Sequence, residues 1–230
     1  MKTRDSIRAL VFDLDETISG SPHVRAWRKA LKQMWIKVPS HIWSQFIHRQ
    51  RGVSNEQAAL GLERLLGKHI DRQTLCTLKR GYAVQMAAKV PIYCDFMDAL
   101  PVLLRRPYLV AIWTSSNRQY WETLCSRSAL LSKVPCATIE SDGGVSKPDP
   151  AGFFRALGLV GLSPSDAERT AVIGDSIAKD LKGGHNAGCK TMIYYCRSGR
   201  SVEADPDHLV TARVSRHRCL PSLLSRLAGE

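Results

Sequence analysis

Two aspartates stand directly after the first apolar segment of the chain, in the stretch VFDLDET. Asp13 and Asp15 follow the β-favouring run 7–12 and are separated by Leu14 alone. Two carboxylates this close repel each other unless a cation or a shared proton joins them. Carboxylate oxygens are also the ligands that a hard divalent ion prefers. The pair therefore indicates chemistry at this point rather than an ordinary turn.

A second acidic pair follows a later apolar segment, in the stretch TAVIGDSIAKD. Gly174 and Asp175 end the run 170–173, and Asp180 comes five residues after Asp175, on the first turns of an expected helix. If the two runs are neighbouring strands, Asp175 and Asp180 can meet Asp13 across the loops. Three carboxylates converging on one spot require a divalent ion, and oxygen ligands with retained waters suit Mg²⁺.

Two further segment ends carry groups that could bind an anion. The run 108–113 leads into Thr114, Ser115 and Ser116, whose hydroxyl and N–H groups precede an expected helix N-terminus. Lys147 lies between a Gly-rich turn and a Pro-containing loop in GGVSKPDP, so its ammonium is expected to be held in place. Taken singly, each feature also fits a structural role, because Ser and Thr commonly cap helices and loop lysines are commonly solvated.

The elements that would gather these residues alternate along the chain. Short, β-favouring apolar runs occur at 7–12, 108–113, 134–139, 170–173 and 191–195, and helix-compatible segments occur at 118–130, 150–158 and 177–187. This order predicts an α/β fold with a doubly wound, Rossmann-like parallel sheet. Such sheets place ligand sites beyond the carboxyl ends of their strands, where all the polar groups above are expected.

The interval 20–92 breaks this alternation, because it contains no convincing strand. Its apolar residues recur at helical spacing. Ser54 and Gln57 predict the start of one helix, which is expected to end near Gly67. We therefore predict an all-helical cap domain at 20–92, inserted into a catalytic core formed by 1–19 and 93–230. Three tryptophans of this insertion, Trp27, Trp35 and Trp43, are expected to pack inside it.

Composition excludes several classes of protein. With 230 residues, 44% hydrophobic and 23% charged, the chain is typical of a globular protein, and no apolar run reaches the ~18 residues of a membrane helix. The charged N-terminus does not resemble a signal peptide, so we expect a cytoplasmic protein. Seven scattered cysteines without C-x-x-C spacing predict free thiols. The net charge of +12 attracts anions, which leaves open phosphorylated metabolites, nucleic acid or solubility alone.

The order and spacing of these motifs resemble the haloacid dehalogenase-like (HAD) hydrolase superfamily over residues 8–196. The D-x-D-x-T signature is present at 13–17, the strand-ending Thr is Thr114, the Lys is Lys147, and G-D-x-x-x-x-D spans 174–180. The resemblance implies that Asp13 is a nucleophile that becomes an aspartyl-phosphate. It implies that Asp15 acts as general acid and base, a carboxylate that the superfamily's dehalogenases lack.

The resemblance also implies how the reacting group is held. Mg²⁺ would be bound by Asp13, the backbone carbonyl of Asp15, and Asp175, and Asp180 would bind it through water or orient Lys147. Lys147 would neutralise charge on the phosphoryl group, and Thr114 and Ser115 would hold that group.

Three alternatives remain for the substrate. Glu16 replaces a more common Gly, and D-L-D-E-T also occurs in the superfamily's phosphoprotein phosphatases, but the helical insertion resembles the cap of small-molecule members. Among these, phosphoglycolate phosphatases and β-phosphoglucomutases are similar, which implies substrate contacts for His23 and Arg51. Asn55 stands where the mutases carry a basic residue. The expected activity is hydrolysis of a small phosphate monoester; the alternatives are a phosphomutase, a phosphoprotein phosphatase, and a nucleic-acid-binding protein with or without end-phosphatase activity.

Overall fold

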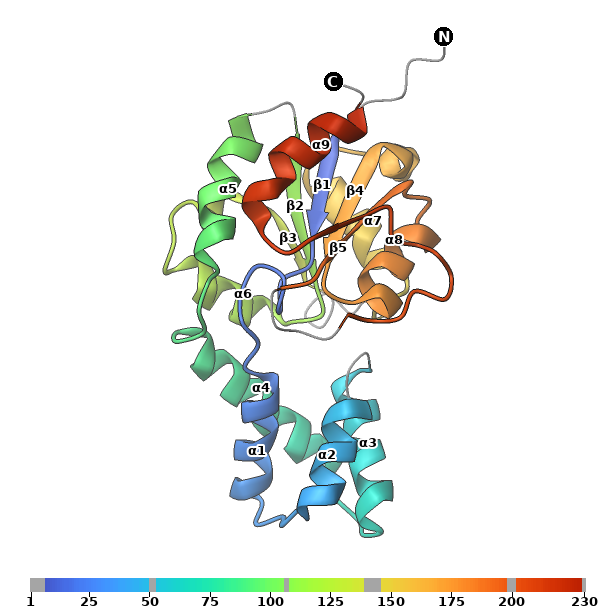
Figure 1. Cartoon of the computed structure of the whole chain (residues 1–230). Coiled ribbons are helices and arrows are strands. Elements are labelled where there is room, and N and C mark those ends of the chain that lie inside the picture. Colours follow the sequence, from blue (N-terminus) through green and yellow to red (C-terminus); the bar gives the residue numbers. More distant parts are fainter. Residues whose placement is uncertain (1–6, 50–52, 106–107, 139–145, 198–201, 229–230) are drawn as a thin grey trace. The chain divides into compact units, whose positions relative to one another are not determined.

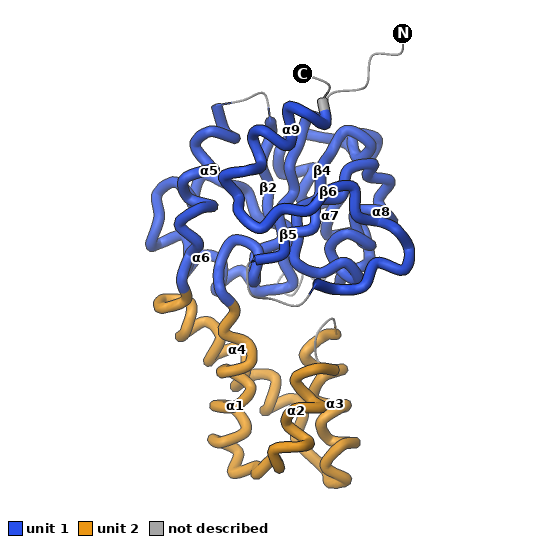
Figure 2. The backbone as a smooth tube through the Cα atoms, in the orientation of Figure 1, with its two compact units in different colours: residues 1–20, 91–230 blue, residues 21–90 orange. Residues whose placement is uncertain are grey.

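The structure is a computed structural model that describes residues 7–49, 53–105, 108–138, 146–197 and 202–228. The chain divides into two compact units, which Figure 2 shows in separate colours. The core unit comprises residues 1–20 and 91–230, and the helical unit comprises residues 21–90. The division lies close to the boundaries expected from the sequence, although a functional role of the smaller unit as a cap stays a prediction.

The core unit is built on a parallel sheet with the strand order β3-β2-β1-β4-β5-β6 (Figure 1). Its strands are β1 (Ala9–Phe12), β2 (Leu109–Thr114), β3 (Cys136–Thr138), β4 (Thr170–Gly174), β5 (Thr191–Tyr195) and β6 (Ala212–Val214). The helices that follow the insertion are α5 (Cys94–Arg105), α6 (Arg118–Cys125), α7 (Ala151–Leu159), α8 (Lys182–Asn186) and α9 (Leu220–Ala228). Helices cover both faces of the sheet, so the predicted α/β fold class is confirmed.

Two segments of the core unit differ from the sequence-based prediction, one near the C-terminus and one after β2. The segment after Arg197 is polar and Arg-rich with a weakly amphipathic final segment, which predicts a tail, but β6 lies within it and pairs in parallel with β5. This strand has only three residues, and of these only Val214 is buried. A pattern this short does not distinguish an edge strand from a loop. The helix expected at 118–130 is also shorter, because α6 ends at Cys125.

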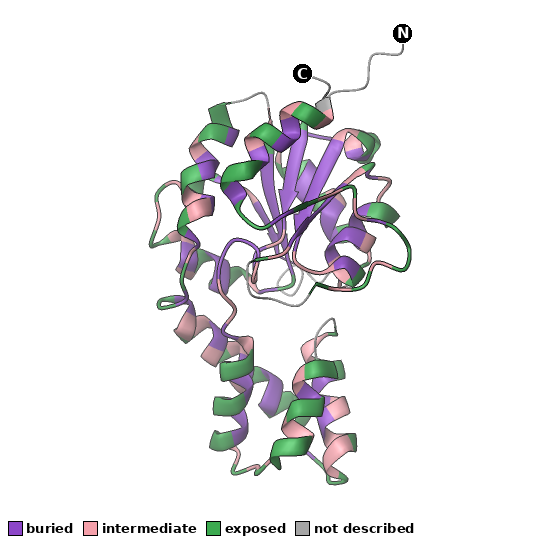
Figure 3. Cartoon of the chain, viewed as in Figure 1, coloured by how far each residue is buried: buried purple, intermediate pink, exposed green. Residues whose placement is uncertain are grey.

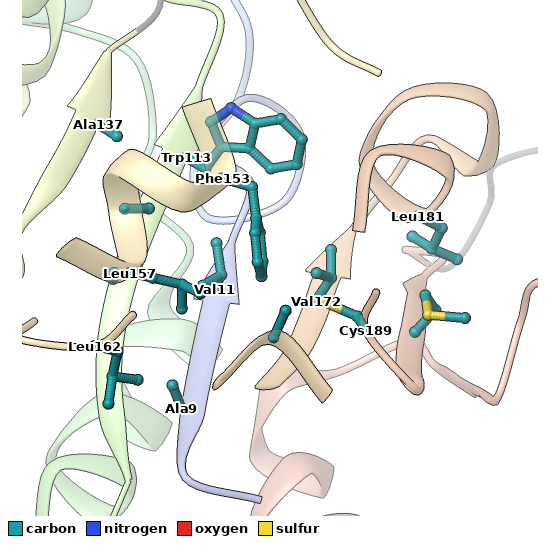
Figure 4. Close-up of a cluster of buried hydrophobic side chains, with 14 of the residues drawn as sticks. Ala9, Val11, Trp113, Ala137, Phe153, Leu157, Leu162, Val172, Leu181 and Cys189 are labelled. Carbon is teal, nitrogen blue, oxygen red and sulfur yellow. The ribbon is translucent and has the colours of Figure 1, made fainter. Parts of the chain in front are cut away.

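One face of the sheet packs against α7 and α8 through a cluster of buried side chains (Figure 4). Trp113 of β2 meets Phe153 of α7 edge to face, with ring centroids 5.8 Å apart. Gly183 of α8 allows this packing, because a Cβ at that position would lie 2.4 Å from the Trp113 ring. Burial of each large side chain contributes about 1.5–3 kcal/mol. The cluster thereby fixes the carboxyl end of β2, from which the anion-binding candidates extend.

The helical unit contains α1 (His23–Gln33), α2 (Ser40–Arg49), α3 (Asn55–Leu66) and α4 (Arg72–Ala87). Each helix carries buried residues on one side and exposed residues on another, as Figure 3 shows. Ser54 and Gln57 form a reciprocal capping box, and Gly67 ends α3 in the left-handed conformation, so both predicted ends of this helix are confirmed. None of the described helices has the length and apolar character that crossing a bilayer requires.

The prediction for the three tryptophans holds for Trp27 and is wrong for Trp35. Trp27 is 1% exposed and packs on Phe46, and Trp43 is partly buried against the same ring. Trp35 is 92% exposed. The physical reason is that α1 ends at Gln33 and Trp35 adopts a φ of +57°, so its side chain leaves the buried stripe that helical spacing would continue.

Candidate active site

The site is built at the carboxyl edge of the sheet, directly after its central strand. β1 pairs with β2 on one side and β4 on the other, with Phe12 opposite Ile112 and Ile173. The next residue, Asp13, still donates its N–H to the carbonyl of Ile173 at 2.8 Å. This register places the first aspartate between the ends of the two strands that carry Thr114 and Asp175.

Lys147 is the buried cation of the site. It is 3% exposed, and its Nζ lies 2.7 Å from Oδ1 of Asp13 and 2.8 Å from Oδ1 of Asp180. The same ammonium donates to the carbonyl oxygen of Trp113 at 2.6 Å. Burial by itself would lower the pKa of Lys147, but the charges of Asp13 and Asp180 raise it above the usual value. The side chain therefore stays an ammonium ion, held by three acceptors.

Three carboxylates converge beside this ammonium. Among the described residues, Asp13, Asp175 and Asp180 each offer an oxygen, and these oxygens lie within 4.8 Å of one another. The side chains of Asp13 and Asp180 are only 11% and 4% exposed. Burial and the charge of Asp180 raise the pKa of Asp13 to about 7, although Lys147 acts in the opposite direction.

The donor set fits a hard divalent cation. All three groups are carboxylates, which suit Mg²⁺. One lysine offsets only one of the three negative charges, so a further cation would relieve the repulsion that remains. The expected metal site at Asp13, Asp175 and Asp180 is therefore chemically consistent, and binding of the ion stays a prediction.

Asp180 is positioned by close packing and by a backbone bond. Its Oδ2 accepts the N–H of Ser176 at 3.0 Å. A Cβ on Gly174 would lie 2.4 Å from the Cβ of Asp180, so the glycine of the G-D motif is required by this approach. The turn is anchored from outside the motif by Glu203, which accepts the N–H of Ile177 at 2.7 Å. Nothing in the sequence singled out Glu203.

The carboxylate of Asp15 lies outside the acidic cluster and is held by one residue before α6 and one residue within it. Its Oδ2 accepts a hydrogen bond from Oγ of Ser116 at 2.7 Å, and its Oδ1 accepts one from the hydroxyl of Tyr120 at 3.2 Å. Burial and then the charge of Asp15 raise the pKa of Tyr120, so the phenol stays a donor. Ser116 was expected to contribute to an anion site, but its bond to Asp15 was not predicted. Tyr120 was not predicted at all, and its only signal was the helix start after TSSN.

The candidate anion-binding residues stand at the end of β2. Thr114 is fully buried, and its Oγ1 accepts the N–H of Ser116 at 3.0 Å. Ser115 is exposed. The side chain of Asn117 caps α6 by accepting the N–H of Tyr120 at 2.8 Å. The expected helix start is present here, and the binding of a phosphoryl group by Thr114 and Ser115 stays a prediction.

Two predicted substrate contacts belong to other parts of the chain. His23 begins α1 in the helical unit, where its N–H approaches Oγ of Ser21 at 3.4 Å. Arg51 lies outside the described residues. Both assignments stay predictions.

Glu16, which stands where the family resemblance leads us to expect glycine, has an uncommon backbone conformation. It has a φ of +65°, a conformation that favours glycine. Its Oε2 accepts a hydrogen bond from the hydroxyl of Tyr93 at 2.8 Å, and the guanidinium of Arg197 lies 3.9 Å from the centre of the Tyr93 ring. Burial and the bond to Glu16 raise the pKa of Tyr93 to about 12. These contacts hold the side chain of Glu16 in place next to Asp15.

Comparison with known proteins finds a family model and several curated relatives that match this chain. A family model described as haloacid dehalogenase-like hydrolase matches residues 10–194. N-acylneuraminate-9-phosphatase from Mus musculus is 27% identical over 139 residues, which cover 59% of this chain and 53% of that protein. The chain thus spans about half the length of the first curated relatives it matches. Glyceraldehyde 3-phosphate phosphatase from Methanopyrus kandleri is 24% identical over 97% of this chain and 100% of its own length.

Solved structures show the same fold. A hydrolase from Pseudomonas syringae superposes with a TM-score of 0.72 at 22% identity, covering 96% of this chain and 99% of that one. CbbY from Rhodobacter sphaeroides, solved in complex with phosphate, has a TM-score of 0.72 at 17% identity and covers 93% of this chain and 96% of its own. At these identities the likeness concerns the fold alone.

Proposed function

The chain belongs to the haloacid dehalogenase-like hydrolase family, and on that premise we propose that it is a Mg²⁺-dependent phosphatase of small phosphate monoesters. The observation that carries the proposal is the buried contact of Asp13 with Lys147, at 2.7 Å, inside the cluster completed by Asp175 and Asp180. A carboxylate with this surrounding is suited to accept a phosphoryl group, because positive charge lies where negative charge accumulates.

In the first step, an oxygen of Asp13 attacks the phosphorus of the substrate. A bond forms between Asp13 and phosphorus as the bond from phosphorus to the ester oxygen breaks. Lys147 stabilises the added charge from its fixed place between Asp13 and Asp180. The N–H and hydroxyl groups of Thr114 and Ser115 would orient the transferring group at the end of β2.

Asp15 supplies and removes the proton. It donates a proton to the departing ester oxygen, and then takes one from the water that attacks the aspartyl-phosphate, which releases inorganic phosphate. The hydrogen bonds from Ser116 and Tyr120 support this role, because they fix the direction of the carboxylate.

Mg²⁺, when bound, would lower the charge repulsion between the carboxylate and the phosphate dianion. Asp13 and Asp175 are the proposed direct ligands, together with the backbone carbonyl of Asp15. Asp180 already holds Lys147 through Oδ1, which supports an orienting role for this residue.

The substrate is proposed to be a small phosphorylated metabolite. The names of the curated relatives support this, since they denote phosphatases of N-acylneuraminate 9-phosphate and glyceraldehyde 3-phosphate. The helical unit supports it as well, because a cap that closes over a site excludes water and bulky substrates. His23 and Arg51 are proposed to contribute to recognition of the substrate.

The test is phosphate release from a panel of phosphorylated metabolites, measured with Mg²⁺ and with EDTA. Asp13→Asn should abolish turnover and leave the fold intact, as the circular dichroism spectrum checks, and EDTA should abolish turnover of the wild type. Asp98→Asn, on an exposed position of α5, is the matched control and should retain activity. Turnover by the Asp13→Asn enzyme would refute the proposed nucleophile.

The same assay separates the alternatives. A phosphomutase would yield an isomerised sugar phosphate that depends on a bisphosphate activator, without stoichiometric free phosphate. A phosphoprotein phosphatase would release phosphate from a phosphopeptide in preference to every metabolite of the panel.

A further inference from the structure

The two units differ strongly in net charge. Residues 21–90 contain thirteen Lys or Arg and three Asp or Glu, a net charge of +10 within the +12 of the whole chain. Basic residues occur throughout the sequence, but no acidic residue occurs between Glu16 and Glu56. The excess positive charge of this protein therefore belongs to the helical unit, and within it to the part that includes α1 and α2.

The three acidic residues of the helical unit are engaged on α3 and α4. Glu56 pairs with Arg80, and Glu63 lies 3.4 Å from the guanidinium of Arg72. Asp71 caps the start of α4. α1 has no acidic residue of its own, so none of its cations is offset within the helix.

The cations of α1 form a row along its exposed side. Arg25, Arg28, Lys29 and Lys32 follow each other at spacings of three, one and three residues, which places them on successive turns of one face. All four are exposed, whereas the opposite side of α1 is buried in the core of the unit. Lys37, in the turn that follows, is exposed as well.

Aromatic rings accompany this row. The guanidinium of Arg28 lies 4.9 Å from the ring centre of Trp43, and Nζ of Lys29 lies 5.4 Å from that of Tyr82. Trp35 stands in the turn between α1 and α2, 92% exposed, with a backbone conformation that is uncommon for a bulky residue. Figure 1 shows this turn and the α3–α4 turn at the same end of the helical unit, and the α3–α4 turn adds the exposed Lys68.

We call the exposed cations of α1 and the turn after it, together with the exposed tryptophan of that turn, the basic face: Arg25, Arg28, Lys29, Lys32, Trp35 and Lys37. We propose that the basic face binds a single-stranded nucleic acid. A row of cations along a helix matches the phosphates of a flexible strand, and neutralising them releases counterions. An exposed indole offers a flat ring on which an unpaired base can stack. This function goes beyond phosphate release from metabolites and does not depend on it.

Two other partners fit the observations less well. An anionic bilayer would need an apolar helix face to insert, but the apolar residues of α1, Ala26, Trp27, Ala30 and Leu31, are already buried in the unit. A second copy of the chain would bring two units of net charge +10 together, and like charges oppose that association.

The experiment measures binding of a fluorescein-labelled oligothymidylate to the full chain by fluorescence anisotropy. With four phosphates neutralised, raising the salt from about 50 mM to about 200 mM should weaken binding about 50-fold. Binding should also quench tryptophan fluorescence, since Trp35 is the most exposed large apolar side chain among the described residues.

Two variants of the basic face test the residues. The quadruple change of Arg25, Arg28, Lys29 and Lys32 to Gln should remove most of the binding and most of its salt dependence. Trp35→Ala should weaken binding about ten-fold, through loss of one stacked base, and should abolish the quenching. The matched control removes four exposed charges from the core unit and should bind nearly as the wild type: Lys133→Gln, Arg155→Gln, Lys190→Gln and Arg226→Gln.

Three results would overturn the proposal. The first is no binding of the oligonucleotide at about 50 mM salt. The second is a loss of binding in the core-unit control as large as that in the quadruple variant of the basic face. The third is binding to phosphatidylserine vesicles without binding to the oligonucleotide. Circular dichroism melting curves of all variants show whether a loss reflects unfolding. Phosphate release from small esters, assayed in parallel, separates failure of this proposal from failure of the proposed phosphatase activity.

Discussion

The core unit and the helical unit use charge in opposite ways. In the core unit, Lys147 is 3% exposed and its Nζ lies within 2.8 Å of three acceptor oxygens. Its position is therefore fixed, and the carboxylates of Asp13 and Asp180 balance its charge. In the helical unit, the cations of α1 are exposed and act together through an excess of +10. A charge that takes part in bond making must be held by neighbours, whereas a charge that attracts a polyanion works through number and spacing.

The largest expected effect comes from removing the buried cation. Lys147→Met leaves Asp13 and Asp180 buried without their ammonium, so turnover should fall at least 100-fold, and the free energy of unfolding without Mg²⁺ should fall by about 3–5 kcal/mol. Steady-state kinetics and urea denaturation measure the two effects. Lys190→Met, with a side chain that is 69% exposed, is the control and should change stability by less than about 0.5 kcal/mol. Equal effects of the two substitutions would remove the contrast between held and exposed charge.

A buried histidine of the core unit, His217, should resist protonation. His217 is fully buried, stacks on Tyr195 with centroids 4.2 Å apart, and lies 3.2 Å from Asp95. Burial lowers its pKa from 6.5 to about 4, even though Asp95 acts to raise it. The unfolded chain therefore binds a proton before the native chain does, and stability should be lost as the pH falls from 6.5 towards 4, by about 3 kcal/mol in total.

Urea denaturation at several pH values measures this loss. His217→Phe keeps an aromatic ring in the stack, and the backbone N–H at 217 can still donate to Asp95, so the variant is the control that lacks only the titrating group. A wild type and a variant that lose stability in parallel below pH 6.5 would contradict the assignment.

Two glycines, one in each unit, differ in the space that surrounds them. Gly174→Ala would drive a Cβ to 2.4 Å from Asp180, so the variant should lose about 1–3 kcal/mol of stability and most of its activity. Gly81→Ala in α4 meets nothing within 4 Å and should instead stabilise the chain by about 0.5–1 kcal/mol. Thermal melting of both variants measures the difference, and a stable, active Gly174→Ala enzyme would show that Asp180 does not need its observed place.

The smallest expected effect concerns the orientation of Asp15. Tyr120→Phe removes the hydroxyl that donates to Oδ1 of Asp15 and leaves the bond from Ser116 in place. Turnover should fall about ten-fold, and stability should change by about 1 kcal/mol. If kcat is unchanged for substrates with poor leaving groups, which depend most on protonation, Tyr120 does not position the acid.

Most of the fold and the acidic residues of the site were predictable because their signals are local. A buried parallel strand needs a continuous apolar run, and a polar residue just after such a run stands at the sheet edge, as Asp13 and Asp175 do. The reciprocal cap at Ser54 and the left-handed Gly67 are read from residues within one helix. β6 was missed because a strand of three residues with one buried side chain carries too little pattern.

The partners of these residues were decided by the folded chain alone. Ser116 reaches Asp15 across 101 positions of the sequence, and Lys147 reaches Asp13 across 134. No local pattern encodes such a pairing, because it depends on the order in which the strands join the sheet. Glu16 takes a left-handed backbone while its side chain accepts a hydrogen bond from the distant Tyr93. Trp35 leaves its helical stripe at the local end of α1, where the N–H groups of Trp35 and Ile36 donate to carbonyls of the last helical turn. The order of the amino acids therefore determined which residues could form a site, because apolar runs and the polar residues after them are local. Only the tertiary structure decided which of these residues lie close together, because that depends on how the strands join the sheet.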